Sequence, residues 1–306
     1  MNIIIKIIII FLLILSQASK AGRIFLSGFE QENANMFIKS SFDNIIIDRQ
    51  VSWNHHLTGI DSVTAYTFPD DLPGNNNEDF FNYLVSDNNN YLPFVDARID
   101  STTGIDGNPT NALYIEFKKD DPNMISISRV QYVIVGDETS SDLVQRMNKG
   151  YVKYKIKKHL DDIENVDWAL PFELKDTNDI GFRVGLYLYG TSTPNPYWVA
   201  KGQYMLETGL GDDVWQQDNH DIAFNQDEWF ELEVYWYASP DPQLGRFKVA
   251  IDGTKIFDVT NQTKDPLYPN KMFYFMPFKV YGAKGFSWIT GFEYWDEIPN
   301  GSILSN

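Results

Sequence analysis

Clustered carboxylates are the first residues in this sequence whose types and spacing could do chemistry. Glu231 and Glu233 lie two residues apart in DEWFELEVYW, and Glu293, Asp296 and Glu297 follow in EYWDEI. Hydrolysis of a glycosidic bond needs two carboxyl groups that flank the bond. Neither segment supplies the full set of groups. Two glutamates that share the solvent face of a strand are the simpler interpretation.

Histidines are the next candidates, and the chain has only four of them, at His55, His56, His159 and His220. Adjacent residues on a strand point to opposite faces, so the neighbouring pair at 55 and 56 is poorly placed to bind one metal ion. His220 is the best candidate for a general base, because the carboxylate of Asp221 beside it would raise its basicity.

An acidic, turn-rich segment at 209–227 could bind a cation. Its aspartates at Asp212, Asp213, Asp218 and Asp221 offer oxygen ligands, but their spacing is not that of an EF-hand. A solvated acidic loop is the simpler interpretation. We therefore predict a loop here and no cofactor, with a structural calcium ion as the alternative.

Strands are the elements that must position these residues. Apolar residues alternate with polar ones through 112–119, 150–157, 181–189, 246–253 and 286–298. In GFRVGLYLY one face holds Phe182, Val184, Leu186 and Leu188, and the other holds Arg183, Tyr187 and Tyr189. Only one short helix is indicated, at 140–148. The sequence predicts an all-β, antiparallel β-sandwich with few short helices.

The N-terminus and the composition predict where the protein acts. Residues 1–21 have a lysine, an apolar run and small residues near the end, as in a secretory signal peptide. We expect the remaining residues, 22–306, to form one secreted domain, which is monomeric and has no membrane contact after cleavage. A formal charge of −17 argues against nucleic acid and anionic membranes as partners. It also disfavours a highly anionic substrate, unless the binding cleft is locally basic.

The order of the strand segments resembles a known family. It runs through NALYIEFKKDD, GYVKYKIK, WALPFELKD, FRVGLYLYG, PYWVAKGQY, EWFELEVYW, GRFKVAIDGTKIFDVT, PFKVYG and GFEYWDEI, over residues 25–298. This pattern resembles the concanavalin A-like jelly roll, in the branch of heparin-lyase-like and alginate-lyase-like polysaccharide lyases. The resemblance implies two antiparallel sheets, one of them bent, with a concave face that holds an extended sugar chain.

At the positions that correspond to the lyase motifs, this sequence has mostly different residues. The Gln-x-His pair of such lyases would fall at Glu173 and Lys175, where a glutamate cannot neutralise a substrate carboxylate. The Tyr-x-Lys strand keeps Lys279 but has Pro277 in place of the tyrosine, and Tyr281 could substitute. If elimination persists, Tyr187, Tyr189 or Tyr281 would be the acid, and Arg183 would hold the carboxylate.

We therefore expect a secreted, carbohydrate-active protein that engages a polysaccharide or oligosaccharide on its concave sheet. The predicted substrate-binding residues are Arg183, Tyr187, Tyr189, Lys153, Lys155, Glu173, Lys175, Tyr197 and Lys201, and the predicted catalytic residues are Tyr281, His220 and Arg183. No residue is predicted to bind a catalytic metal. A divergent polysaccharide lyase is one hypothesis. A non-catalytic, lectin-like module and a structural protein whose aromatic face packs on another protein are the alternatives.

Overall fold

The computed structural model describes most of the chain from residue 95 onward and several earlier strands. The described residues are 23–27, 35–42, 45–52, 81–84, 95–118, 130–135, 148–161, 167–175, 181–206, 209–267, 274–280 and 282–305. The predicted signal peptide, the two adjacent histidines and Tyr281 lie outside them, as does the helix predicted at 140–148 apart from its last residue.

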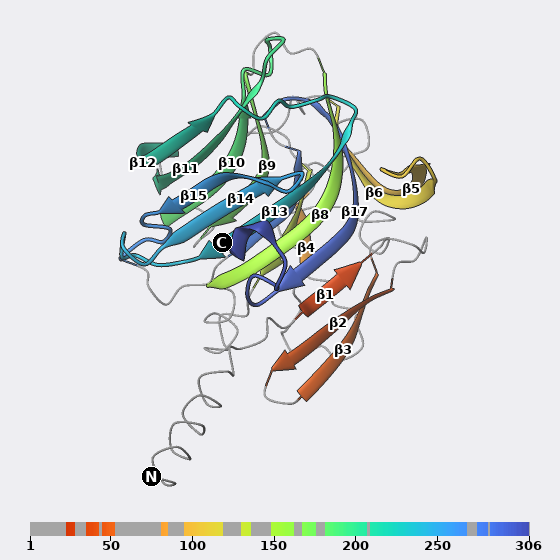
Figure 1. The fold of residues 1–306 in the computed structure, drawn as a ribbon, viewed down its shortest axis with the longest axis horizontal. Helices are drawn as coiled ribbons and strands as arrows, with labels where there is room; N and C mark the ends of the chain where they lie inside the picture. Colours follow the sequence, from red (N-terminus) through yellow and green to blue (C-terminus); the bar gives the residue numbers. More distant parts are fainter. Residues whose placement is uncertain are drawn as a thin grey trace, which may run out of the picture.

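Ten of the described strands form the larger of two antiparallel sheets. Its main path is β15 (Thr254–Thr260), β14 (Arg246–Ile251), β13 (Trp229–Tyr237), β8 (Lys149–Leu160), β17 (Gly285–Trp295), β1 (Arg23–Ser27), β2 (Asn35–Phe42) and β3 (Ile45–Ser52). A branch is formed by β6 (Pro109–Phe117), which pairs with β17, and by β5 (Val95–Thr103), which pairs with β6. Figure 1 shows β1, β2 and β3 extending this sheet away from β13–β15.

The smaller sheet has seven strands, in the order β12 (Gly209–Asn219), β11 (Tyr197–Leu206), β10 (Gly181–Tyr189), β9 (Trp168–Lys175), β16 (Tyr274–Val280), β7 (Val130–Val135) and β4 (Phe81–Leu84). The loop predicted at 209–227 is therefore wrong for its first half, because β12 pairs with β11 along the edge of this sheet. A short 3-10 helix, η1 (Ile303–Ser305), follows the last strand.

The hydrophobic core lies between the two sheets, as the alternation predicts. The apolar faces of β10 and β13 are both buried in one cluster, which includes Leu186 and Trp236. Rings from opposite sheets meet there: Phe172 lies 6.3 Å from Trp236, and Trp198 lies 5.8 Å from Phe230, between ring centroids. The predicted antiparallel sandwich is confirmed. Within the described part of the chain, no helix is long and apolar enough to cross a membrane.

Candidate functional site

The face of the seven-stranded sheet that points away from the core carries aromatic residues at one end. Tyr189 on β10 pairs in register with Trp168 on β9 and with Tyr197 on β11. Directly paired residues share a face of a sheet, so these rings form a line that crosses three strands. His220, which follows β12, extends the line, and its ring stacks on Tyr197 at 4.2 Å.

We call Trp168, Tyr189, Tyr197 and His220 the ring row. The centroids of Tyr189 and Tyr197 lie 6.2 Å apart with nearly parallel planes, 29° from each other. His220 is exposed, and the other three rings are half-buried. Aromatic rings that keep an open face can stack on apolar surfaces of a ligand while their polar edges remain in water.

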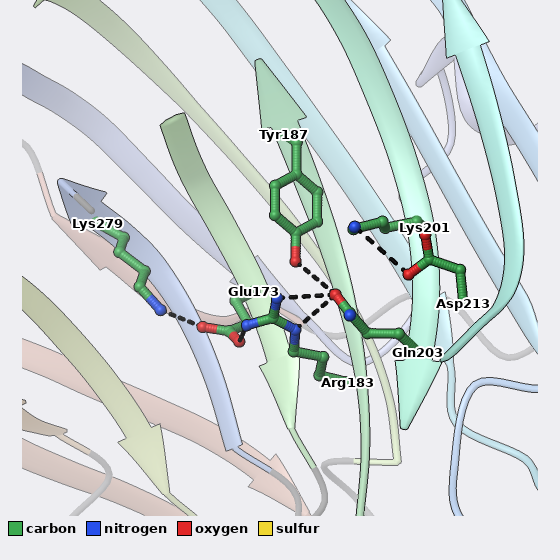
Figure 2. A network of polar contacts seen from close by, with 7 residues as sticks. All are labelled: Glu173, Arg183, Tyr187, Lys201, Gln203, Asp213 and Lys279. Atoms are coloured by element: carbon green, nitrogen blue, oxygen red, sulfur yellow. Dashed lines mark hydrogen bonds and ion pairs between the residues drawn. The ribbon is translucent and has the colours of Figure 1, made fainter. Parts of the chain in front are cut away.

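A network of charged and polar side chains continues the same face toward the other end of the strands. We call Glu173, Arg183, Tyr187, Lys201, Gln203, Asp213 and Lys279 the polar network; Figure 2 shows how these residues converge from β9, β10, β11, β12 and β16.

Glu173 and Gln203 are the acceptors at the centre of the polar network. Glu173 Oε1 lies 3.3 Å from Arg183 Nη1, and its other oxygen, Oε2, accepts from Lys279 Nζ. Gln203 Oε1 accepts from Arg183 Nε at 2.9 Å, from Arg183 Nη2 at 2.7 Å and from the Tyr187 hydroxyl at 3.0 Å. Protein acceptors thus hold the guanidinium of Arg183 from two sides. Because its N–H donors lie in one plane, these hydrogen bonds also fix the orientation of that plane.

Lys201 links the polar network to the ring row. Its Nζ lies 3.4 Å from Asp213 Oδ1, and it also lies 4.9 Å from the Tyr187 ring centroid and 5.7 Å from that of Tyr189. These separations allow cation–π attraction. Gly185 makes room for this arrangement, because a Cβ there would lie 2.5 Å from the Tyr187 ring.

The centre of the polar network is closed to solvent. Glu173 is fully buried, and Arg183 exposes only 6% of its surface. Burial by itself raises the pKa of Glu173, but the positive charges of Lys279, Lys175 and Arg183 outweigh it and hold that pKa below its ordinary value. Glu173 is therefore an anion with its counter-charges built in.

Tyr187 is a proton donor in this site. Burial raises the pKa of its hydroxyl well above the ordinary value, with nearby Arg183 acting in the opposite direction. The hydroxyl donates its proton to Gln203 at 3.0 Å. A phenol with a raised pKa is protonated at neutral pH, which is the form that the predicted acid role requires.

The structure brings together most, but not all, of the predicted binding residues. The strand register places seven of them on the outer face of the seven-stranded sheet: Arg183, Tyr187, Tyr189, Glu173, Lys175, Tyr197 and Lys201. Lys153 and Lys155 do not share it: they lie on β8, which belongs to the ten-stranded sheet. Grouping them with Arg183 is a mistake that strand alternation could not reveal, because alternation fixes the face of a strand and not its sheet.

The predicted acid pair lies on that larger sheet too. Glu231 is ion-paired with Lys153 at 2.7 Å. Glu233 accepts a hydrogen bond from the Tyr151 hydroxyl at 2.7 Å and another from Ser302 in the C-terminal segment. Both carboxylates thus have structural partners on the outer face of the larger sheet, but only Glu231 is partly exposed there, because Glu233 is buried.

Of the predicted catalytic residues, the structure places two and does not bring them together. His220 belongs to the ring row at the edge of the sheet, whereas Arg183 belongs to the buried network. His159 pairs instead with Asp227, at 3.0 Å on the larger sheet. Gln203 was not among the predicted residues. It lies two residues from Lys201 and six from Tyr197 in YWVAKGQY, so the strand period of two could have placed it on the same face.

Two of the aspartates that were considered for calcium have protein partners. Asp213 forms an ion pair with Lys201. Asp218 accepts a hydrogen bond from Gln216 Nε2 at 2.8 Å. Across the described residues, no group of three or more histidines, cysteines or acids is arranged to hold a metal ion.

Comparisons with known proteins find likeness in structure alone. No protein-family model and no curated protein matches the chain. Among solved structures, the chain is similar to an endo-β-1,4-glucuronan lyase from the fungus Trichoderma reesei, with a TM-score of 0.43 and 12% identity, over 71% of this chain and 94% of that one.

Two further structures represent other activities. The chain is similar to domain 4 of a GH43 extracellular arabinanase from Geobacillus stearothermophilus in complex with arabinotriose, with a TM-score of 0.44 and 11% identity, over 94% of this chain and 98% of that one. It is also similar to a PL-14 alginate lyase from Aplysia kurodai, with a TM-score of 0.40 and 12% identity, over 64% and 86% of the respective chains.

Proposed function

We propose that this protein binds a polysaccharide across the outer face of its seven-stranded sheet, with the ring row as the contact surface. The observation that carries the proposal is the register of Trp168, Tyr189 and Tyr197, which sets three half-buried rings side by side across neighbouring strands. An extended sugar chain that crosses the strands would meet one ring after another. The C–H faces of its residues would stack on them, and its hydroxyl groups would bond to polar neighbours.

Binding without cleavage is the form of this function that the described residues support best. Elimination next to a uronate carboxylate needs a group to neutralise that carboxylate and a base to take the proton. Arg183 is held by Glu173 and Gln203, and His220, the predicted base, lies in the ring row and not beside Arg183. The predicted signal peptide would deliver such a module to glycans outside the cell.

A divergent lyase is the second candidate, because Arg183, Gln203 and Tyr187 do converge within hydrogen-bonding distance. Elimination creates an unsaturated sugar that absorbs in the near ultraviolet. Incubation with alginate, glucuronan, heparinoids and pectate should therefore give no rise in absorbance if the protein is a binding module. A progressive rise that Tyr187→Phe abolishes would establish the lyase instead.

Affinity electrophoresis in gels that contain soluble neutral and acidic polysaccharides tests the binding function. The wild-type protein should be retarded by at least one glycan. Tyr197→Ala should weaken that binding about tenfold or more, equivalent to about 1.4 kcal/mol. Tyr237→Ala is the matched control, since Tyr237 is an exposed tyrosine of the larger sheet. Absence of retardation by every glycan, or equal effects of the two substitutions, would overturn the proposal.

A further inference from the structure

The exposed border of the ring row is acidic. Asp218 on β12 pairs in register with Val199, two residues from Tyr197 on the same face. Asp167 precedes Trp168, and its Oδ1 accepts from the backbone N–H and the hydroxyl of Ser192, at 3.1 and 2.6 Å. Both aspartates are exposed, so each keeps a hydrated negative charge beside the rings.

These two charges act on the hydroxyl of Tyr197. The pKa of its hydroxyl is raised, first by partial burial and then by the negative charges of Asp218 and Asp167. A carboxylate on a ligand that stacks on Tyr197 would feel the same repulsion. Two unit charges about 5 Å apart in water repel by an amount equivalent to about a fourfold loss of affinity.

The polar network holds one cation more than it holds anions, but its three cations are buried and are engaged by protein acceptors. Lys201, which approaches the ring of Tyr189, has its charge balanced by Asp213 at 3.4 Å. Deeper in the sheet, Glu173 occupies the position between Lys279 and Arg183 that a ligand carboxylate would need. A carboxylate fixed by the fold competes at a very high effective concentration, so a dissolved one cannot displace it.

We propose that this face is specific for an uncharged polysaccharide and discriminates against chains that carry carboxylates. The inference rests on the proposed binding function and adds the chemical class of its ligand. Asp218 and Asp167 repel an acidic chain at the surface, and Glu173 removes the anion site below it. The formal charge of −17 on the whole chain acts in the same direction at long range.

The test compares matched pairs of oligosaccharides that differ only in oxidation at C6. Suitable pairs are β-1,4-glucan and β-1,4-glucuronan, β-1,4-mannan and mannuronan, and α-1,4-galactan and galacturonan. Isothermal titration at low salt should show about tenfold or more tighter binding to the neutral member of the bound pair. The difference should narrow at 0.5 M salt, because screening weakens repulsion between exposed charges.

Asp218→Asn should narrow the preference about threefold or more by strengthening binding of the acidic member alone. Asp258→Asn is the control, because it removes the same charge from β15 on the other sheet, where Asp258 pairs with Lys255 at 2.8 Å. It should leave the preference unchanged. Equal narrowing by both substitutions would show a bulk charge effect and refute the local role of Asp218.

The two proposals fail in different ways. If the wild-type protein binds the acidic member as tightly as the neutral one, and Tyr197→Ala weakens both, the charge selectivity is wrong and the binding function stands. If neither member of any pair binds, the binding function itself fails.

Discussion

Replacing Glu173 with glutamine is the substitution that tests the polar network most directly. The side chain keeps its size but loses the charge that Lys279 and Arg183 share. Removing one partner of a buried ion pair costs about 3–5 kcal/mol, because the remaining charge stays buried without compensation. The free energy of unfolding of a domain is typically about 5–15 kcal/mol, so Glu173→Gln should lose a large part of the protein's stability.

Urea unfolding followed by tryptophan fluorescence at pH 7 measures this loss. The double variant Glu173→Gln with Lys279→Met is the control, because it removes one buried anion together with one buried cation. It should recover at least about 1–2 kcal/mol relative to the single variant, as expected for residues in one network. A single variant within about 1 kcal/mol of wild type would show that Glu173 does not hold the network together.

The pH dependence of the same experiment has a defined sign. Because the folded state lowers the pKa of Glu173, its contribution is fully present above the unfolded pKa of about 4.3 and is lost as the pH falls toward the folded pKa. The stability difference between wild type and Glu173→Gln should therefore be constant from pH 7 to about pH 5 and shrink below it. A difference that is unchanged at pH 3.5 contradicts the reasoning.

Three further substitutions test other parts of the fold. Leu186→Ala should cost about 2–5 kcal/mol in urea unfolding, because its side chain lies in the core between the sheets, but should leave glycan affinity per folded molecule unchanged. Burial lowers the pKa of Lys158 to about 7, so the folded protein binds this proton more weakly than the unfolded chain between pH 7 and 10. Unfolding free energy should therefore rise with pH by up to about 1.4 kcal/mol per unit, and Lys158→Met should remove that rise; an equal rise in both proteins argues against it. Leu304→Ala should cost about 2 kcal/mol or more, because Leu304 is fully buried against Tyr151, and an unchanged midpoint would exclude that packing role.

Local sequence was enough to predict which faces of β10 and β13 pack between the sheets. In GFRVGLYLY and in EWFELEVYW the alternation assigns Leu186 and Trp236 to the core and Arg183 and Glu231 to the outer faces. This succeeds because the side-chain period of a strand is two and one face must be dry.

Pairing between distant segments could not be predicted in the same way. Lys153 was grouped with Arg183 because both alternate with apolar residues, yet β8 pairs with β13 and β17, while β10 pairs with β9 and β11. Which sheet a strand joins depends on contacts far apart in the chain. The strand at Gly209–Asn219 was missed for a related reason: it is an edge strand with register shifts, and most of its described side chains are exposed, so its sequence shows little alternation.

The burial of the polar network and the exposure of the ring row belong to one arrangement. A flat aromatic surface binds sugar well only if its rings are already oriented, since ordering them on binding costs free energy. Tyr187 lies over Gly185 with its hydroxyl bonded to Gln203, and its ring centroid is 5.7 Å from that of Tyr189. A lyase would use such charged residues to contact its substrate. Here the charged residues of the polar network pair with one another and hold the sheet surface that supports the rings.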